Sequence, residues 1–229
     1  MSILDLTLYS AKFSVGEKEF ASDIEMMIHH IDGVDSMGFT NHFKLPHYVT
    51  FQADLQVFSN AADFAKDKKL NHANFLTSHK LSSKHILSPS RQGKYRAEAV
   101  GVFGNEGLVY SAIEGFLVEN EMNTLFSIID ERLKTKMTPA EAIFWASWIH
   151  LEIALIHPFL DGNGRSARLI EKWFLSEKLG RSIWFLQTER AYFEKRTKYY
   201  SSLKNGTNYW ELKPSKFNTF ITLLFSFIK

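Results

Sequence analysis

The hydrophobic pattern of the chain predicts a mainly helical fold built around one apolar helix. Thr138-Pro139-Ala140-Glu141 is a capping box with proline at the first helical position, so a helix should open there and run to about Ile156. A helix that is apolar nearly all round is typical of a buried central helix. We expect its one histidine to be a buried, hydrogen-bonded structural residue. The polar positions of this helix are few: Glu141, Ser147, His150 and Glu152.

Further helical patterns flank this central segment. Gly164–Leu179 reads as a helix that ends at Gly180. Asn60–Lys68 and Asn71–Ile86 read as two helices upstream. From about Pro214, apolar residues recur at the spacing of one helical face, which should pack on the core. The residues of that face are Phe217, Phe220, Ile221, Leu224, Phe225 and Ile228.

One segment departs from the helical pattern. Arg96–Phe103 is rich in β-formers, with Val100 and Val102 in alternation, and Gly104-Asn105-Glu106-Gly107 follows as a turn. We therefore expect an all-α fold that carries one small β-hairpin.

Composition narrows the classes of function. The 229 residues suffice for one large domain or two small ones. We divide them into an N-terminal helical segment, 1–60, and a catalytic core, 61–229, packed as one compact domain. The chain has 27 Lys and Arg residues against 25 Asp and Glu residues, a net charge of +2. This near balance does not indicate a basic surface for binding nucleic acid. The absence of cysteine fits a reducing cytoplasm, and no apolar run is long enough to cross a membrane.

The most informative run is 157–168, His-Pro-Phe-Leu-Asp-Gly-Asn-Gly-Arg-Ser-Ala-Arg. Asp161 is a hard oxygen ligand suited to Mg²⁺. Gly162 and Gly164 bracket Asn163, so the backbone can turn tightly and present N–H groups to phosphate oxygens. The helix that follows would direct its N-terminal donors and its positive dipole end at the same anion.

Side chains at both ends of this run add charge and a base. Arg165 and Arg168 are three residues apart, so both lie on one side of the first helical turn and suit bidentate phosphate contacts. His157 sits just before the loop and could act as a general base. The run therefore indicates a site that handles a triphosphate.

This run resembles the Fic family signature, His-x-Phe-x-Asp/Glu-Gly-Asn-Gly-Arg-x-x-Arg, and matches every defined position. Fic enzymes mostly transfer AMP from ATP to a protein hydroxyl. The resemblance implies that His157 is the general base, that Asp161 holds Mg²⁺ between the α- and β-phosphates, and that Phe159 anchors the loop in the core. The residues implied for phosphate binding are Gly162, Asn163, Gly164, Arg165 and, at the γ-phosphate, Arg168.

Two further segments resemble parts of the Fic fold. The hairpin of Val100, Val102 and Phe103 resembles the flap beside the active site, which holds the target protein by strand addition. Tyr199 and Tyr200 resemble tyrosines that line the nucleotide pocket. Stacking on adenine and plain core packing both remain open for them.

Several alternatives stay open at this point. The same site removes AMP from proteins in some Fic members, and one branch transfers the terminal phosphate. That branch carries a bulky basic residue in place of Gly164, so nucleotidyl transfer is favoured here. An alternative from outside the enzymes is a regulatory module that binds a nucleotide without catalysis. Such a module would not need His157. The target protein, the nucleotide preference, self-modification and homo-oligomer formation are not disclosed.

A last hypothesis concerns inhibition. Many Fic proteins carry a helix with the pattern Ser/Thr-x-x-x-Glu-Gly/Asn, whose glutamate pairs with the second motif arginine. The stretch Ala21-Ser22-Asp23-Ile24-Glu25-Met26 resembles its Ser-Ser-x-Ile-Glu-Gly form, but departs from it at Ala21 and Met26. Glu25 is therefore the candidate inhibitory residue, and an external inhibitor protein is the alternative.

Overall fold

The computed structural model describes residues 60–227 apart from 85, 105–106, 204–205 and 212–216. Residues 60–67 are helical and precede α4 (His72–Ser82). The hairpin strands are β1 (Gly101–Gly104) and β2 (Gly107–Ser111), followed by the 3-10 turn η2 (Gly115–Leu117). The remaining elements are α5 (Val118–Lys134), α6 (Pro139–Ile156), α7 (Asn163–Leu179), η3 (Arg181–Phe185), α8 (Thr188–Glu194), α9 (Arg196–Leu203), η4 (Tyr209–Glu211) and α10 (Phe217–Phe225).

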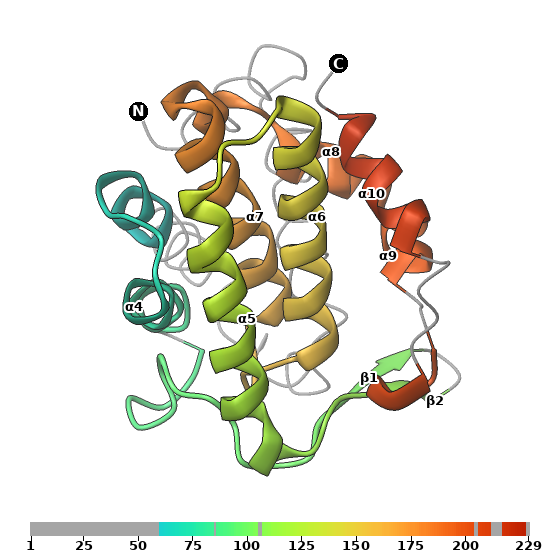
Figure 1. The fold of residues 1–229 in the computed structure, drawn as a ribbon. Helices are drawn as coiled ribbons and strands as arrows, with labels where there is room; N and C mark the ends of the chain where they lie inside the picture. The colour runs from blue at the N-terminus through green and yellow to red at the C-terminus, as the bar shows by residue number, and fades with distance from the viewer. Residues whose placement is uncertain (1–59, 85, 105–106, 204–205, 212–216, 228–229) are drawn as a thin grey trace, which may run out of the picture.

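The helices form a bundle with α6 and α7 at its centre. Figure 1 shows α5 and α6 side by side with α7 behind them, α4 on one flank and α8–α10 on the other. The hairpin lies at the end of the bundle where α6 finishes. A mainly helical fold with one small antiparallel hairpin, as the sequence predicts, is confirmed in the described residues.

The central helix begins as predicted. Thr138 accepts a hydrogen bond from the Glu141 N–H, and the Glu141 carboxylate accepts one from the Thr138 N–H at 2.7 Å. This closes the capping box on both sides. The next helix ends at Gly180, where φ is 97°, as its glycine predicts.

The expectation that α6 is buried all round is wrong for its outer face. Phe144 is 42% exposed, and Trp145 and Trp148 are half-buried. Their rings are in edge contact with one another, so they form a stripe that the described residues cover only in part. An apolar pattern predicts that a helix is mostly covered from water. It does not show that every face is covered by the rest of the same chain.

Two boundaries and one helical face also differ from the prediction. The helix α4 ends at Ser82 rather than Ile86. The Ser82 and Ser83 hydroxyls donate to the His79 carbonyl there, which also accepts from the Ser83 N–H, a local bonding pattern that is common where helices end. The strand β1 begins only at Gly101. On α10, Leu223 is buried beside Phe220 and Leu224, although the predicted stripe omits it.

Candidate active site

The motif loop joins α6 to α7 through two residues with left-handed backbone. His157 caps α6 with φ 53° and ψ 59°. Among the described residues, it is the one non-glycine residue whose φ is positive. Gly162 precedes α7 with φ 82°. A Cβ at Gly162 would lie 3.3 Å from the Arg165 guanidinium and 3.4 Å from the His79 ring. The left-handed conformation therefore favours glycine there, and the neighbours leave little spare room for a side chain.

The His157 ring is held in one tautomer. It is 6% exposed, and its Nδ1 lies 3.2 Å from the Ala154 carbonyl oxygen. Because a carbonyl only accepts hydrogen bonds, Nδ1 carries the proton and Nε2 carries the lone pair. A lone pair on Nε2 is what a general base needs, so this geometry suits the role that the sequence predicts.

Asp161 and Arg165 face each other across the first turn after the loop. Arg165 Nη2 lies 3.6 Å from Asp161 Oδ1, and the Asp161 carboxylate also accepts a hydrogen bond from the Gly162 N–H. Both side chains are largely buried. Within the described residues no three His, Asp or Glu side chains gather as a metal cage. A single carboxylate fits Mg²⁺ that takes its other ligands from substrate phosphates and water.

The start of α7 is suited to anion binding. The Ser166 N–H donates to the Gly162 carbonyl at 2.9 Å and forms the first helical bond. The N–H groups before it point out of the helix end, where the dipole is positive. The first-turn residues of α7 are all non-acidic, so none of them opposes an anion. This end of α7 includes Asn163, Gly164 and Arg165, three of the predicted phosphate-binding residues.

The Asn163 side chain has a structural task within the loop. Its Oδ1 accepts from the Phe159 N–H at 2.8 Å, and its Nδ2 donates to the Phe159 carbonyl at 2.9 Å. The side chain is fully buried. Any contact of Asn163 with a phosphate would therefore come from its backbone. Phe159 is also fully buried, as its predicted anchoring role requires.

Arg168 lies one turn further along α7 and lines a pocket between α7, α8 and α9. The pocket is a shallow depression, whose cavity proper holds only about 20 Å³. Tyr199 is only 3% exposed, whereas Tyr200 is half-buried. Tyr200 is thus the more accessible of the two predicted tyrosines. The residues that line the pocket are Arg168, Glu189, Tyr192, Phe193, Arg196, Tyr199 and Tyr200.

A buried polar network underlies this pocket. The Glu171 carboxylate accepts from His150 Nδ1 at 2.6 Å and from the Tyr192 hydroxyl at 2.6 Å. The Tyr199 hydroxyl lies 3.0 Å from His150 Nε2. Burial and the nearby Glu171 charge raise the Tyr192 pKa, so its hydroxyl remains a donor. The prediction that His150 is a buried structural histidine is confirmed.

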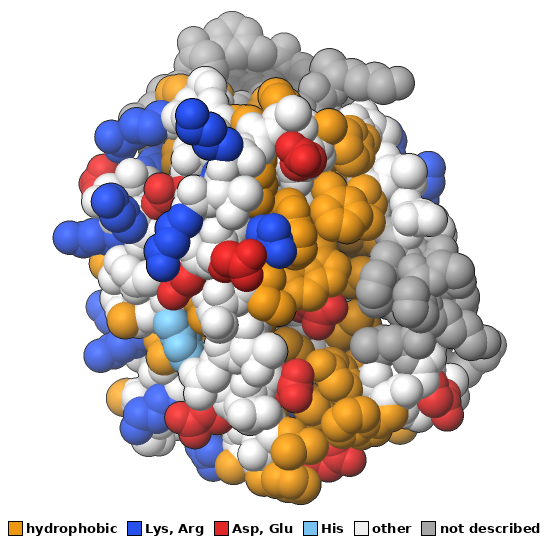
Figure 2. Space-filling view, viewed as in Figure 1, with side chains coloured by type: hydrophobic (Ala, Val, Ile, Leu, Met, Phe, Trp, Pro, Cys, Tyr) orange, Lys and Arg blue, Asp and Glu red, His pale blue; other side chains and the backbone are white. Residues whose placement is uncertain are grey.

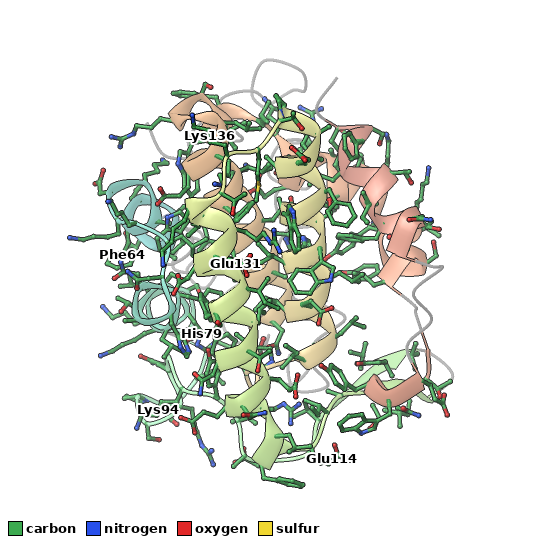
Figure 3. All side chains as sticks on the ribbon, in the orientation of Figure 1. Phe64, His79, Lys94, Glu114, Glu131 and Lys136 are labelled. Atoms are coloured by element: carbon green, nitrogen blue, oxygen red, sulfur yellow. The ribbon has the colours of Figure 1, made fainter. Side chains whose placement is uncertain are left out.

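Sequence reasoning missed His79, which lies on α4 (Figure 3) and connects that helix to the motif loop. Its Nδ1 accepts from the Gly93 N–H at 3.0 Å, so its Nε2 carries a proton and donates to the Asp161 carbonyl at 3.0 Å. The ring stacks on Phe159 at 3.5 Å between centroids. Burial lowers the His79 pKa to about 4, which keeps the ring neutral at pH 7. In the sequence, the one indication that His79 is buried is its position four residues after Phe75, which places both side chains on the same helix face.

Arg96 is the second residue that sequence reasoning missed. It is 2% exposed, and its guanidinium donates to the His157 carbonyl at 2.7 Å and to the Ile113 carbonyl at 2.7 Å. It also donates to the carbonyls of Ile156 and Glu98. These oxygens include the negative dipole end of α6, which compensates the buried cation. Arg96 thus fastens the base of the hairpin to the motif loop.

The predicted flap is present as β1 and β2. Val102 pairs with Tyr110, and the register shifts between Val102 and Phe103. Val100 precedes β1, and its carbonyl accepts from the Ala112 N–H at 3.1 Å. The side chain of Phe103 lies outside the described part of the chain. The Tyr110 hydroxyl donates to the Leu155 carbonyl at 2.9 Å, which ties the hairpin to α6.

A central apolar helix followed by this loop defines a helical domain of the Fic type. Residues 69–175 match the family model Fic/DOC, and this part of the chain belongs to that family. A Fic family protein from Desulfovibrio desulfuricans G20 shares the fold with a TM-score of 0.61 at 18% identity, covering 99% of this chain and 74% of that one. A Fic domain containing signaling protein from Bacteroides thetaiotaomicron VPI-5482 gives 0.61 at 17% identity, with coverages of 99% and 92%.

The N-terminal segment matches a different family. Residues 1–64 match the model of the bacterial phosphonate metabolism protein PhnI. The chain is 45% identical over 65 residues to the putative C-P lyase subunit protein HtxH of Stutzerimonas stutzeri, which covers 28% of this chain. A PhnI subunit of alpha-D-ribose 1-methylphosphonate 5-triphosphate synthase from Rhizobium meliloti is 44% identical over 57 residues, 25% of this chain. The chain spans only 17% and 16% of these two relatives.

Glu25 falls within this PhnI-like segment and outside the described residues. Its role as an inhibitory residue therefore stays a prediction. So does the division of the chain into 1–60 and 61–229. In the described residues no helix is both long enough and apolar enough to span a membrane.

Proposed function

We propose that this chain is a Mg²⁺-dependent protein adenylyltransferase, which transfers AMP from ATP to a Ser, Thr or Tyr hydroxyl of a target protein. Fic proteins transfer nucleotidyl or other phosphate-containing groups, and residues 69–175 belong to that family. The observation that carries the finer proposal is His157. Its Nδ1–H faces a carbonyl, its Nε2 carries the lone pair, and the same loop leads into the N-terminal end of α7, which has no acidic residue in its first turn.

His157 would take the proton of the target hydroxyl through Nε2 as that oxygen attacks the α-phosphorus. A new oxygen–phosphorus bond forms. The bond between the α-phosphorus and the bridging oxygen breaks, and pyrophosphate leaves with the electron pair. Charge grows on the leaving oxygens, where Arg165 and the N–H groups of the α7 end would stabilise it.

The metal and the nucleotide base have candidate positions on either side of this loop. Mg²⁺ held by Asp161 would neutralise charge on the bridging phosphates. The solvent-open depression beside Arg168 would seat only part of the nucleotide, with Tyr200 offering a ring for adenine. Tyr199 would instead shape the pocket floor, because its hydroxyl already meets His150.

The hairpin offers a docking surface for a target segment. The described strands form a sheet of two, in which β1 has β2 on one side. An extended target segment could add to the open edge of β1. Large apolar side chains surround the hairpin and are well exposed, as protein-binding surfaces often are. They are Leu108 at 58%, Phe116 at 80% and Trp210 at 63%.

Labelled ATP separates the proposal from its alternatives. The chain is incubated with Mg²⁺, a protein extract, and ATP labelled at either the α- or the γ-phosphate. Label from the α-phosphate on protein, absent with the γ-label, supports AMP transfer. Label from the γ-phosphate alone would indicate phosphate transfer and contradict the proposal. Release of AMP from pre-modified protein, without transfer, would identify a hydrolase.

Two variants assign the roles of the charged residues in that assay. Asp161→Asn should shift the Mg²⁺ concentration needed for half-maximal rate upward, because a metal ligand is weakened. Arg165→Lys should lower the rate without restoring it at high Mg²⁺, because the guanidinium fork is lost. A similar Mg²⁺ dependence in wild type and Asp161→Asn would contradict the metal assignment.

Inhibition by Glu25 is tested with the same labels. If Glu25 restrains the enzyme, Glu25→Gly should increase self-modification and target labelling severalfold. Equal labelling by the wild type and a folded Glu25→Gly variant would remove Glu25 from the mechanism and favour an external inhibitor.

A further inference from the structure

A chain of four buried side chains joins α6, α7, α8 and α9. At its centre, the Glu171 carboxylate of α7 accepts from His150 of α6 and from the Tyr192 hydroxyl of α8, each at 2.6 Å. The other ring nitrogen of His150 lies 3.0 Å from the Tyr199 hydroxyl of α9. All four side chains are almost fully buried. The four helices are therefore connected through short polar contacts in the interior.

Apolar groups cover this chain of contacts. The Phe220 ring of α10 lies 4.8 Å from the His150 ring, centre to centre, and the Phe227 ring lies 4.9 Å from the Tyr192 ring. Figure 2 shows apolar side chains gathered over α6 and α10 on this side of the molecule. Hydrogen bonds in such surroundings are stronger than in water, and they hold the groups that make them rigidly.

Stability alone does not account for Glu171. Burying a carboxylate is costly, and an apolar side chain of similar size often stabilises a protein more. Within the described part of the chain, Glu171 Oε1 is also buried without a hydrogen-bond donor, which adds to this cost. What a carboxylate provides, and an apolar side chain does not, is a fixed direction and distance to each donor.

The outer ends of the chain of contacts belong to the site proposed for the nucleotide. Tyr192 and Tyr199 line the depression beside Arg168. Arg168 precedes Glu171 by three residues, so both lie on one side of α7, and the Arg168 charge acts on the Tyr192 hydroxyl. Tyr200, the ring proposed for adenine, directly follows Tyr199. The placement of Tyr200 relative to Arg168 therefore depends on these contacts.

The next residue of α7 makes a second buried link to the same wall. Lys172 is fully buried, and its Nζ donates to the Glu189 carboxylate at 2.5 Å and to the Leu186 carbonyl at 2.7 Å. Glu189 also lines the depression. The helix α8 has only seven residues, and both links reach it from adjacent positions of α7. They fix its position along α7 as well as its distance from it.

We propose that Glu171 is a positioning residue for the nucleotide. Through His150 and the two buried tyrosines, it holds α8 and α9 at the separation from α7 at which Arg168 and Tyr200 contact one ATP molecule. This inference rests on the proposed function, which supplies ATP as the ligand. Glu171 itself touches no substrate, so its loss should weaken ATP binding and leave the proton transfer at His157 largely unchanged.

The main variant is Glu171→Leu, measured for Mg-ATP affinity by calorimetry and for KM and kcat by label transfer. It leaves the His150 N–H and the Tyr192 hydroxyl without an acceptor. The Kd for Mg-ATP and the KM for ATP should rise about 10- to 100-fold, the effect of misplacing binding groups by about 1 Å. The kcat at saturating ATP should change less than about threefold. Glu171→Gln, which retains an acceptor for both donors, should restore most of the affinity.

Trp173→Phe is the matched control on the same helix. The buried Trp173 indole donates to the Lys68 carbonyl at 3.0 Å, so this variant also loses a buried hydrogen bond, but away from the depression. It should lower the unfolding free energy in urea without changing the Mg-ATP affinity. If Glu171→Leu does not fold, Tyr192→Phe removes only one hydroxyl and should also weaken Mg-ATP binding.

Hydrogen exchange of the ATP-free chain separates this inference from the proposed function. Backbone amides of 188–203 should exchange faster in Glu171→Leu than in the wild type, while those of α5 should change little. A wild type that does not bind Mg-ATP would refute the proposed function, and the nucleotide role of Glu171 with it. A wild type that binds Mg-ATP, with equal affinity in Glu171→Leu or an equal loss in Trp173→Phe, would overturn the positioning role alone. Unchanged exchange over 188–203 would overturn it as well.

Discussion

The motif loop and the hairpin flank the same site but are held in different ways. The loop is fixed by side chains from several elements, namely His79 of α4, Arg96 ahead of the hairpin and Asn163 of α7. The hairpin is attached mainly at its base, through Arg96 and the Tyr110 hydroxyl, while Leu108 near its tip is exposed. Under the proposed function, the clamped loop would position the chemistry, and the more open hairpin would meet variable targets.

Replacing His157 should have the largest effect of the variants considered, because it should abolish the reaction while leaving the fold of the loop intact. His157→Ala should lower the rate of label transfer about 10²–10⁴-fold, because the general base is lost. ATP binding should change little, since the residues proposed to contact phosphate lie further along the loop and at the start of α7. Calorimetry with Mg-ATP, run beside the transfer assay, checks both halves. A variant that labels targets at the wild-type rate would show that another group is the base.

Variants of Arg96 test whether the motif loop depends on the hydrogen bonds that this guanidinium donates. Arg96→Ala leaves four carbonyl oxygens without this donor and should cost about 3 kcal/mol or more of unfolding free energy. Arg96→Lys keeps the charge but not the fork, so it should recover only part of the loss. Urea denaturation measures stability, and kcat reports the position of His157. Full stability in Arg96→Ala would mean that the clamp contributes little to the fold.

His79 makes the stability of the loop depend on pH. Its folded pKa, about 4, lies below its unfolded value of 6.5, so the unfolded chain binds the extra proton first. Its contribution is therefore fully present above pH 6.5 and is lost as pH falls toward 4, by up to about 3 kcal/mol. Urea denaturation of metal-free protein should show this slope in the wild type. The His79→Gln variant should have a lower unfolding free energy at pH 7 than the wild type. Its unfolding free energy should also change less between pH 7 and pH 4.

The hairpin tip should show the smallest effect on stability and a selective effect on targets. Leu108→Ser should change the unfolding free energy by no more than about 0.5 kcal/mol, because the side chain is mostly exposed. If the tip meets the target, KM for a purified target should rise while ATP binding remains unchanged. Leu87→Ser, on the half-buried turn after α4, is a comparison from outside the hairpin. Unchanged KM in Leu108→Ser would place target recognition elsewhere.

Local patterns made most of the fold predictable. The capping box at Thr138, the stop at Gly180 and the reversal between Gly104 and Gly107 each depend on a few adjacent residues, and each has the expected outcome. The motif was predictable for the same reason. His157, Asp161 and Arg165 are close neighbours in the chain, so their sequence alone assigns them to one loop and the helix start that follows it.

The contacts that shape the site were not predictable, because they join distant residues. His79 and Asp161 are 82 positions apart, and Arg96 and His157 are 61 apart. Neither His79 nor Arg96 belongs to a motif with recognisable spacing. The exposed stripe on α6 was missed for another reason. An apolar helix face has the same sequence pattern whether its own chain or a second molecule covers it.

These long separations have a consequence for how the protein acquires its active form. Helices and the short motif loop need only local contacts, whereas each clamp closes a loop of 61 residues or more and bears the entropy of that closure. Contacts of this kind form late when a chain folds. A nascent or partly refolded molecule should thus contain most of its helix before these clamps hold the motif loop in place.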